Sequence, residues 1–236
     1  MKRLFDIVVT LLAAVTWVPA LLLSMLAILV LDGRPVFYVS PRRVHRKKSI
    51  RVWKFRTMRR DAESIANRDT VPVAGTRFLN IERTSPLYTW VGRKIESFAF
   101  TELPQLFHIL AGQMSLVGNR PLPENVIAAI KESIPWAEDR FETPAGLTGP
   151  IQLAGRERLS DAQRIVLESS YCRVARSSYS MWLDFLIIYY TVVVVAGLQR
   201  PFSFSEIRKL IARFDRVGVL DETALEGVLE GEQPPG

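Results

Sequence analysis

The sequence contains very little cysteine and histidine. Its single cysteine, Cys172, excludes an internal disulfide and fits a reducing compartment. The two histidines, His45 and His108, lie far apart and have no companion cysteines, which argues against a zinc site. The sequence also has no internal repeat and no long low-complexity run. Its 236 residues are enough for one domain with a hydrophobic core, with or without appendages.

Acidic residues are fewer than basic ones. The chain has 24 Asp and Glu against 31 Lys and Arg, so its formal net charge is +7, which favours nucleic acid, membrane lipid or phosphorylated substrates as partners. A basic cluster without any acid precedes Asp61: Arg42, Arg43, Arg46, Lys47, Lys48, Arg51, Lys54, Arg56, Arg59 and Arg60. We expect most of it to lie against lipid phosphate. No helix-turn-helix pattern, zinc module or aromatic-interleaved sheet motif accompanies it, so no nucleic-acid partner is expected.

The N-terminal residues 1–32 form a long apolar segment. From residue 7 to 31 it is long enough to cross a bilayer, too long for the apolar part of a signal peptide, and not followed by a small-residue cleavage site. Pro19 lies in its middle, where a proline removes a backbone hydrogen bond and bends a helix. Both flanks are basic and are expected to stay cytoplasmic. We therefore favour a re-entrant helix, although a simple span is also compatible with these charges.

A β-hairpin is predicted after this segment. Residues 35–39 and 50–53 are β-prone and enclose a basic turn. Lys54 and Arg56 follow the second strand directly. Because a strand fixes their positions, we predict that these two side chains are better placed than the rest of the cluster to bind a phosphorylated substrate.

Residues 101–110 have apolar residues at helical spacing. Thr101 is predicted to be the N-cap of this helix, with Glu102 where the helix dipole favours a negative charge. Pro104 suits the first turn, and Gly112 ends the helix. The pattern therefore places one carboxylate at a helix start.

Two loops carry further candidates for the binding of phosphate. An extended piece at residues 114–117 leads into a turn at 118–121 that presents Arg120. The glycine-containing loop at 141–156 includes Thr148 and Arg156, and glycines there allow close backbone approach to a phosphate or nucleotide.

The remaining segments are mostly helical. Further helices are expected at residues 61–68, 87–96, 122–133, 161–182, 183–198 (buried or interfacial) and 201–216 (amphipathic), followed by a loose tail. The predicted fold is mainly helical α+β. It has a membrane segment at 1–32, a globular domain at 33–200 with a small hairpin and interfacial amphipathic helices, and a C-terminal helix and tail at 201–236.

Several of these motifs resemble the bacterial sugar transferases, the small monotopic phosphoglycosyl transferases that start glycoconjugate assembly on a membrane lipid. The corresponding pieces are TELPQL at 101–106 for DELPQL, MSLVGNRP at 114–121 for MSLVGPRP, KRLFD at 2–6 for KRxFD, KFRTM at 54–58, and the glycine loop at 144–156 for PGLTG…Q…GR. They occur in the right order and cover most of the chain.

The resemblance implies transfer of a phosphosugar from a UDP-sugar to undecaprenyl phosphate, with Mg²⁺ as cofactor and release of UMP. This step initiates exopolysaccharide, capsule or O-antigen-type glycan assembly and implies other polysaccharide-assembly proteins as partners. A location at the bacterial inner membrane is also implied, with the globular part on the cytoplasmic face and a re-entrant helix broken at Pro19. Glu102 is then the candidate metal ligand. The candidate substrate-binding residues are Lys54, Arg56, Asn119, Arg120, Thr148 and Arg156.

The sequence departs from the family pattern at three positions. Thr101 stands where the family has its nucleophilic aspartate, Asn119 replaces a proline, and Glu96 stands where an arginine is usual. A threonine hydroxyl is a poor nucleophile without a positioned base. Three hypotheses follow: Glu102 is the nucleophile, Glu102 is a base for Thr101 or for the lipid phosphate, or the chain is an inactive membrane scaffold or regulator of polysaccharide assembly.

Overall fold

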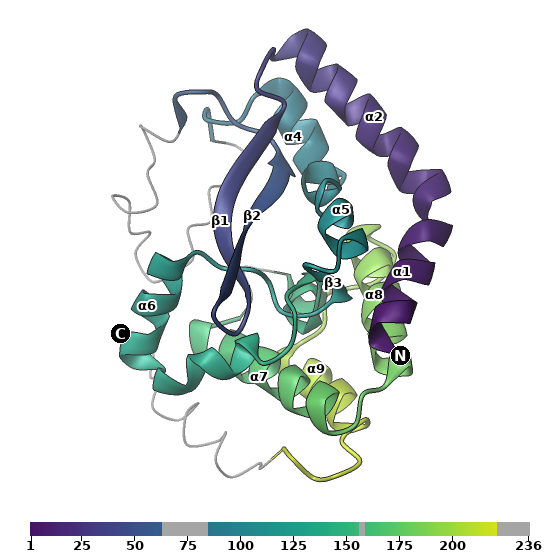
Figure 1. Cartoon of the computed structure of the whole chain (residues 1–236), viewed down its shortest axis with the longest axis vertical. Coiled ribbons are helices and arrows are strands. Elements are labelled where there is room, and N and C mark those ends of the chain that lie inside the picture. The colour runs from purple at the N-terminus through teal and green to yellow at the C-terminus, as the bar shows by residue number, and fades with distance from the viewer. Residues whose placement is uncertain (63–84, 156–158, 221–236) are drawn as a thin grey trace.

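The structure, a computed structural model, describes residues 1–62, 85–155 and 159–220 (Figure 1). Within these ranges helices dominate and two small two-stranded sheets complete the fold, in agreement with the predicted mainly helical class. The predicted helix at 61–68 lies almost entirely outside the described residues, and the predicted tail lies outside them from residue 221 on.

Two helices, α1 (Lys2–Leu12) and α2 (Ala14–Leu31), form the N-terminal segment. They meet at an angle and run along one edge of the molecule (Figure 1). The predicted break at Pro19 is wrong, because Pro19 lies inside α2. The helix is interrupted earlier, where Trp17 Nε1 donates to the carbonyl of Thr10 at 2.9 Å. A continuous helix would use that carbonyl for a backbone N–H of the next turn.

The predicted hairpin is present and longer than expected. Strands β1 (Phe37–His45) and β2 (Lys48–Phe55) pair antiparallel in the middle of the molecule (Figure 1). Much of the basic cluster therefore lies in strands and not in a turn. Arg42 is buried and Arg43 forms ion pairs with two glutamates, so these two arginines do not lie against lipid as expected.

The rest of the described chain forms the following elements: α4 (Trp90–Ser97), η1 (Phe100–Glu102), α5 (Gln105–Leu110), β3 (Ser115–Val117), α6 (Glu124–Ser133), η2 (Pro135–Phe141), β4 (Gly146–Thr148), η3 (Pro150–Ala154), α7 (Asp161–Ser177), α8 (Met181–Val195) and α9 (Phe204–Ala212). The helices predicted near 87–96, 122–133 and 201–216 are confirmed. The predicted helix at 161–182 ends early, because Ser178 leaves the helical region of backbone dihedrals. Its start is confirmed by a capping box between Ser160 and Gln163.

The prediction that Thr101 caps α5 is wrong. Thr101 lies in η1, and α5 begins after Pro104, which has helical dihedrals and no side chain that could accept the orphan N–H groups. The predicted end of the helix is confirmed at Gly112, whose φ of +74° favours glycine.

Three glycines bring two loops into backbone contact. A Cβ on Gly146 would lie 2.1 Å from the backbone nitrogen of Gly118, and a Cβ on Gly149 would lie 2.2 Å from the Gly118 carbonyl oxygen. Strands β3 and β4 pair in parallel at this place. Gly146 and Gly149 thus allow the glycine loop to pack closely against the turn that carries Arg120. The sequence had instead predicted that these glycines allow a phosphate to approach the backbone.

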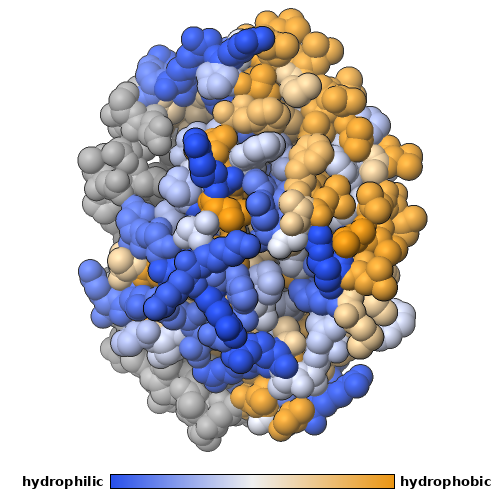
Figure 2. All heavy atoms as spheres, viewed as in Figure 1, coloured by the Kyte–Doolittle hydropathy of each residue, from blue (hydrophilic) through white to orange (hydrophobic). Residues whose placement is uncertain are grey.

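Exposed apolar side chains gather on the N-terminal helices and α8. They include Leu4, Leu12, Val15, Leu23, Val30, Trp182, Phe185, Val192 and Val195. Figure 2 shows apolar surface along the edge where α1 and α2 lie. Among the described helices, α2 is the one long and apolar enough to cross a membrane by length and composition.

Candidate active site

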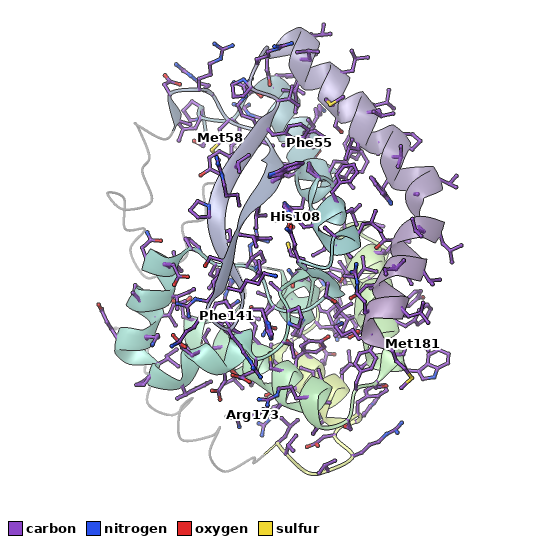
Figure 3. All side chains as sticks on the ribbon, in the orientation of Figure 1. Phe55, Met58, His108, Phe141, Arg173 and Met181 are labelled. Carbon is purple, nitrogen blue, oxygen red and sulfur yellow. The ribbon has the colours of Figure 1, made fainter. Side chains whose placement is uncertain are left out.

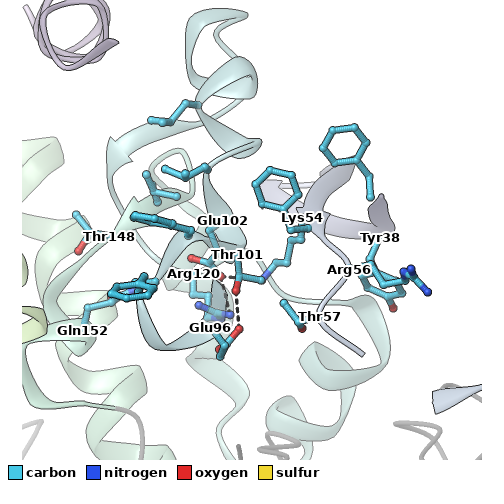
Figure 4. Close-up of a pocket in the computed structure, with 18 of the residues that line it drawn as sticks. Tyr38, Lys54, Arg56, Thr57, Glu96, Thr101, Glu102, Arg120, Thr148 and Gln152 are labelled. Carbon is cyan, nitrogen blue, oxygen red and sulfur yellow. Dashed lines mark hydrogen bonds and ion pairs between the residues drawn. The ribbon is translucent and has the colours of Figure 1, made fainter. Parts of the chain in front are cut away.

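A cleft of about 1910 Å³ lies between the hairpin, the N-terminal helices and α8. Its polar wall comes from the end of β2, from η1 and from the turn after β3 (Figure 4). Its apolar wall includes Val9 and Trp17 from the N-terminal segment and Ile188 and Val192 from α8. The cleft therefore joins a charged surface to an apolar one.

Glu102 is the centre of the polar wall. Its Oε1 accepts from Lys54 Nζ at 2.7 Å and from Arg120 Nη2 at 2.9 Å. All three side chains are mostly buried, so water screens the interaction only in part. The sequence predicted each of these residues as a site residue. The structure brings them together from three separate elements.

Thr101 and Glu96 form a second pair in the same cleft. Thr101 Oγ1 donates to Glu96 Oε2 at 2.6 Å, and both residues line the cleft beside Glu102 (Figure 4). Glu96 was not among the site residues predicted from the sequence. One feature of the sequence could have identified Glu96. It departs from the family pattern only five residues before Thr101, which also departs from it.

Asn119, predicted as a substrate-binding residue, is not among the residues that line the cleft, and its side chain supports the turn. Its buried side-chain amide donates to the carbonyls of Arg140 and Glu168 at 2.8 and 3.0 Å. Arg140 in turn donates to the carbonyl of Arg120 at 2.9 Å and forms a buried ion pair with Glu168. These contacts hold the turn from beneath and so position the guanidinium of Arg120.

Of the three remaining predicted site residues, Arg56 and Thr148 line the cleft but contact other parts of the protein. Arg56 lines the cleft, but its guanidinium donates to the carbonyls of Asp32 and Gly33 at 3.0 and 2.7 Å and so binds the carboxyl end of α2. Thr148 lines the cleft, and its hydroxyl pairs with Thr191 Oγ1 at 2.7 Å. Arg156 lies outside the described residues.

His108, labelled in Figure 3, lies in α5 beside the hairpin. His108 Nε2 accepts from the backbone N–H of Trp53 at 3.3 Å, and Nδ1 contacts Gln113 Oε1 at 2.6 Å. A ring nitrogen that accepts carries no proton, so Nδ1 is the donor to Gln113. The imidazole of His108 thus links β2 to the residues that follow α5.

The carboxylate of Glu102 fits a divalent cation that is shared with a substrate. Mg²⁺ is usually held by one or two carboxylates and by substrate phosphates, and Glu102 supplies one carboxylate to the cleft. Across the described ranges, no three His, Cys, Asp or Glu side chains gather in one group.

A family model and several known proteins each match most of this chain. The family model for "Bacterial sugar transferase" matches residues 1–197. The chain is 34% identical over 200 residues to the undecaprenyl-phosphate glucose phosphotransferase of Komagataeibacter xylinus, covering 81% of this chain and 35% of that protein. It is 31% identical over 201 residues to the exopolysaccharide production protein ExoY of Rhizobium meliloti (strain 1021), covering 82% and 84%.

A third relative is the UDP-glucose:undecaprenyl-phosphate glucose-1-phosphate transferase of Klebsiella pneumoniae, 32% identical over 196 residues, with 81% of this chain and 39% of that protein covered. The chain thus spans little more than a third of two of these relatives and most of ExoY. With a family match over nearly its whole described length and a site built from that family's motifs, the chain belongs to the bacterial sugar transferases.

Proposed function

We propose that this protein transfers a sugar phosphate from a UDP-sugar to undecaprenyl phosphate and so initiates exopolysaccharide, capsule or O-antigen-type assembly. The observation that carries the proposal is the convergence of Lys54, Arg120 and Glu102 in one cleft. Two relatives of the chain are named for the use of undecaprenyl phosphate as acceptor. Other polysaccharide-assembly proteins would then take up the product.

The charges of the site suit a diphosphate substrate. In the free protein, Lys54 and Arg120 share the carboxylate of Glu102. A bound diphosphate offers these two cations a stronger acceptor and leaves Glu102 available as a metal ligand. Mg²⁺ bound there would neutralise charge on the phosphoryl oxygens, while Lys54 and Arg120 orient the diphosphate and stabilise the charge that develops on it.

The size and the walls of the cleft suit two substrates. A volume of about 1910 Å³ exceeds the roughly 300–1,000 Å³ of an ordinary single-ligand pocket. The apolar wall, which includes Val9, Ile188 and Val192, is continuous with elements that expose apolar side chains. A prenyl chain would lie on this wall with its phosphate toward Lys54 and Arg120.

The contacts of the N-terminal segment support a re-entrant, monotopic arrangement at the inner membrane. At one end Lys2 Nζ binds Asp184 of α8 at 2.6 Å. At the other end Asp32 Oδ2 accepts from Thr89 Oγ1 at 2.6 Å. Both ends are therefore held by the same globular part, which a simple span would separate across the bilayer. We place that globular part on the cytoplasmic face, where a UDP-sugar is available.

The test is release of UMP by the purified, detergent-solubilised protein with a panel of UDP-sugars, Mg²⁺ and undecaprenyl phosphate. We expect release by the wild type, a loss of about 100-fold or more in Glu102→Gln, and a similar loss in Lys54→Met. Lys47→Met, in the exposed hairpin turn, is the matched control. No release by the wild type, with activity gained in Thr101→Asp, would mean an inactive member of the family and would refute the proposal.

A further inference from the structure

The pair formed by Thr101 and Glu96 has the geometry of an activated hydroxyl. An ionised carboxylate can only accept, so the hydroxyl of Thr101 is the donor in their hydrogen bond. Its length of 2.6 Å is that of a charge-assisted O–H···O⁻ contact. A nucleophilic hydroxyl and its base need this separation.

The carboxyl end of α4 brings the two residues together. Glu96 lies in the last turn of α4, where the helix dipole disfavours a carboxylate. The chain returns to Glu96 through Ala99, a residue without the freedom of glycine, at φ 58° and ψ 24°. This left-handed conformation is unfavourable for a residue that has a Cβ. Two unfavourable local features thus serve to bring Thr101 onto Glu96, as is common where strain supports a site.

The surroundings place this hydroxyl beside the phosphate-binding groups. Thr101 precedes Glu102, whose carboxylate holds Lys54 and Arg120, and all of these residues line one cleft (Figure 4). A diphosphate bound by the two cations would have a phosphorus atom next to Thr101. The same cations would stabilise the charge that develops when the phosphorus is attacked.

We propose that Thr101 is the nucleophile of this protein and that Glu96 is its base, an inference that rests on the proposed function. In the first step a bond forms between Thr101 Oγ1 and the sugar-bearing phosphorus. The bond from that phosphorus to UMP breaks, UMP leaves with the electron pair, and the hydroxyl proton passes to Glu96 Oε2. In the second step an oxygen of the lipid phosphate attacks the same phosphorus, and Thr101 Oγ1 leaves and regains the proton from Glu96.

The first test is chemical. The purified protein is incubated with a UDP-sugar and Mg²⁺ without the lipid acceptor, and its tryptic peptides are analysed by mass spectrometry. We expect a phosphosugar on Thr101 that resists hydroxylamine, because a phosphodiester of threonine is stable to this reagent and an acyl phosphate is not. A hydroxylamine-labile adduct on Glu96 or Glu102 would overturn the proposal.

The second test separates the two side chains. We expect Thr101→Val and Glu96→Gln each to lower UMP release by about 100-fold or more, with the affinity for UDP-sugar within about threefold of the wild type. Thr101→Ser keeps the hydroxyl and should keep most of the rate. Glu132→Gln, on the exposed side of α6, is the matched control for Glu96→Gln.

The outcomes of these variants also separate this inference from the function on which it rests. Release of UMP at the wild-type rate by Thr101→Val would refute the roles of Thr101 as nucleophile and Glu96 as base. It would leave the proposed transferase function intact. Absence of release from the wild type with every donor would refute both. Thr101→Ser and Glu96→Asp keep the question decidable if a more drastic variant fails to fold.

Discussion

At the scale of single residues, the polar groups of this protein divide into those that face the cleft and those that hold the cleft in shape. Lys54, Glu102 and Arg120 face it. Asn119, next to Arg120 in the chain, points the other way and is only 2% exposed. The family has a proline at this position, and a proline side chain has no hydrogen-bond donor. The asparagine of this chain therefore supports the turn in a different way, because its side-chain amide donates to two carbonyls.

We expect Asn119→Ala to lower the free energy of unfolding by about 1–3 kcal/mol, because buried carbonyls lose a donor. The affinity for UDP-sugar at a temperature where the variant is folded should change little. Urea denaturation in detergent and a binding titration measure the two quantities. Unchanged stability together with a large loss of affinity would return Asn119 to the binding site.

At the scale of elements, Arg43 joins the hairpin to the helices beside it. Arg43 Nε donates to Glu124 of α6 at 2.9 Å, and Nη1 donates to Glu138 of η2 at 3.0 Å. The hydrogen bond from Arg43 is the main reason that the pKa of Glu124 is lowered. The pKa of Glu138 is lowered chiefly by the hydrogen bond from Lys131 and next by that from Arg43. β1 is thus attached to both elements through one guanidinium.

This cluster predicts a dependence of stability on pH. A carboxyl whose pKa is lower in the folded than in the unfolded state stabilises the fold above its ordinary pKa of 4.5. That contribution is lost as the pH falls through the lowered value. We expect the free energy of unfolding to decline below pH 4.5, and to decline less in Arg43→Met.

The decline in the free energy of unfolding should differ between the wild type and Arg43→Met by less than about 1 kcal/mol. The side chains of Glu124 and Glu138 are 55% and 44% exposed, and water screens ion pairs of such exposed groups. Urea denaturation at several pH values measures this difference, with Lys47→Met as the control for loss of one charge. An equal decline in Arg43→Met and in the wild type would contradict the assignment.

At the scale of the whole molecule, the N-terminal segment is an integral part of the globular fold. Besides the contacts at its ends, Asp6 of α1 accepts from Ser115 Oγ at 2.9 Å and from the backbone N–H of Leu116 at 3.1 Å. The carboxylate thus fixes α1 to β3, near the turn that presents Arg120. Arg3 donates to the carbonyl of Leu110 at 2.7 Å and neutralises the carboxyl end of α5.

These contacts predict that both ends of residues 1–32 face the same side of the membrane. In a Cys172→Ser background, a cysteine in a tag ahead of Met1 and a second one at Arg51→Cys, in exposed β2, should be labelled alike. An impermeant maleimide should reach both only after the inner membrane of spheroplasts is made permeable. Labelling of the N-terminal tag in intact spheroplasts would show a simple span and refute the re-entrant arrangement.

The sequence by itself determined where most of the described helices lie and which residues are candidates for the binding of phosphate. Helical periodicity, the capping serine at Ser160 and the breaker Gly112 are local signals, and local backbone preferences decide such features in any fold. The motifs likewise singled out Lys54, Glu102 and Arg120, and the structure brings these three side chains together in one cleft.

Only the tertiary structure decided how these groups are paired. That Asn119 supports a turn, that Gly146 meets Gly118, and that Glu96 accepts from Thr101 depend on contacts between separate segments and on the left-handed turn at Ala99. The early interruption of the N-terminal helix also depends on one side chain, Trp17, that takes a backbone carbonyl. Such contacts have no local signature, since they exist only after the packing of distant segments brings the partners within hydrogen-bond distance.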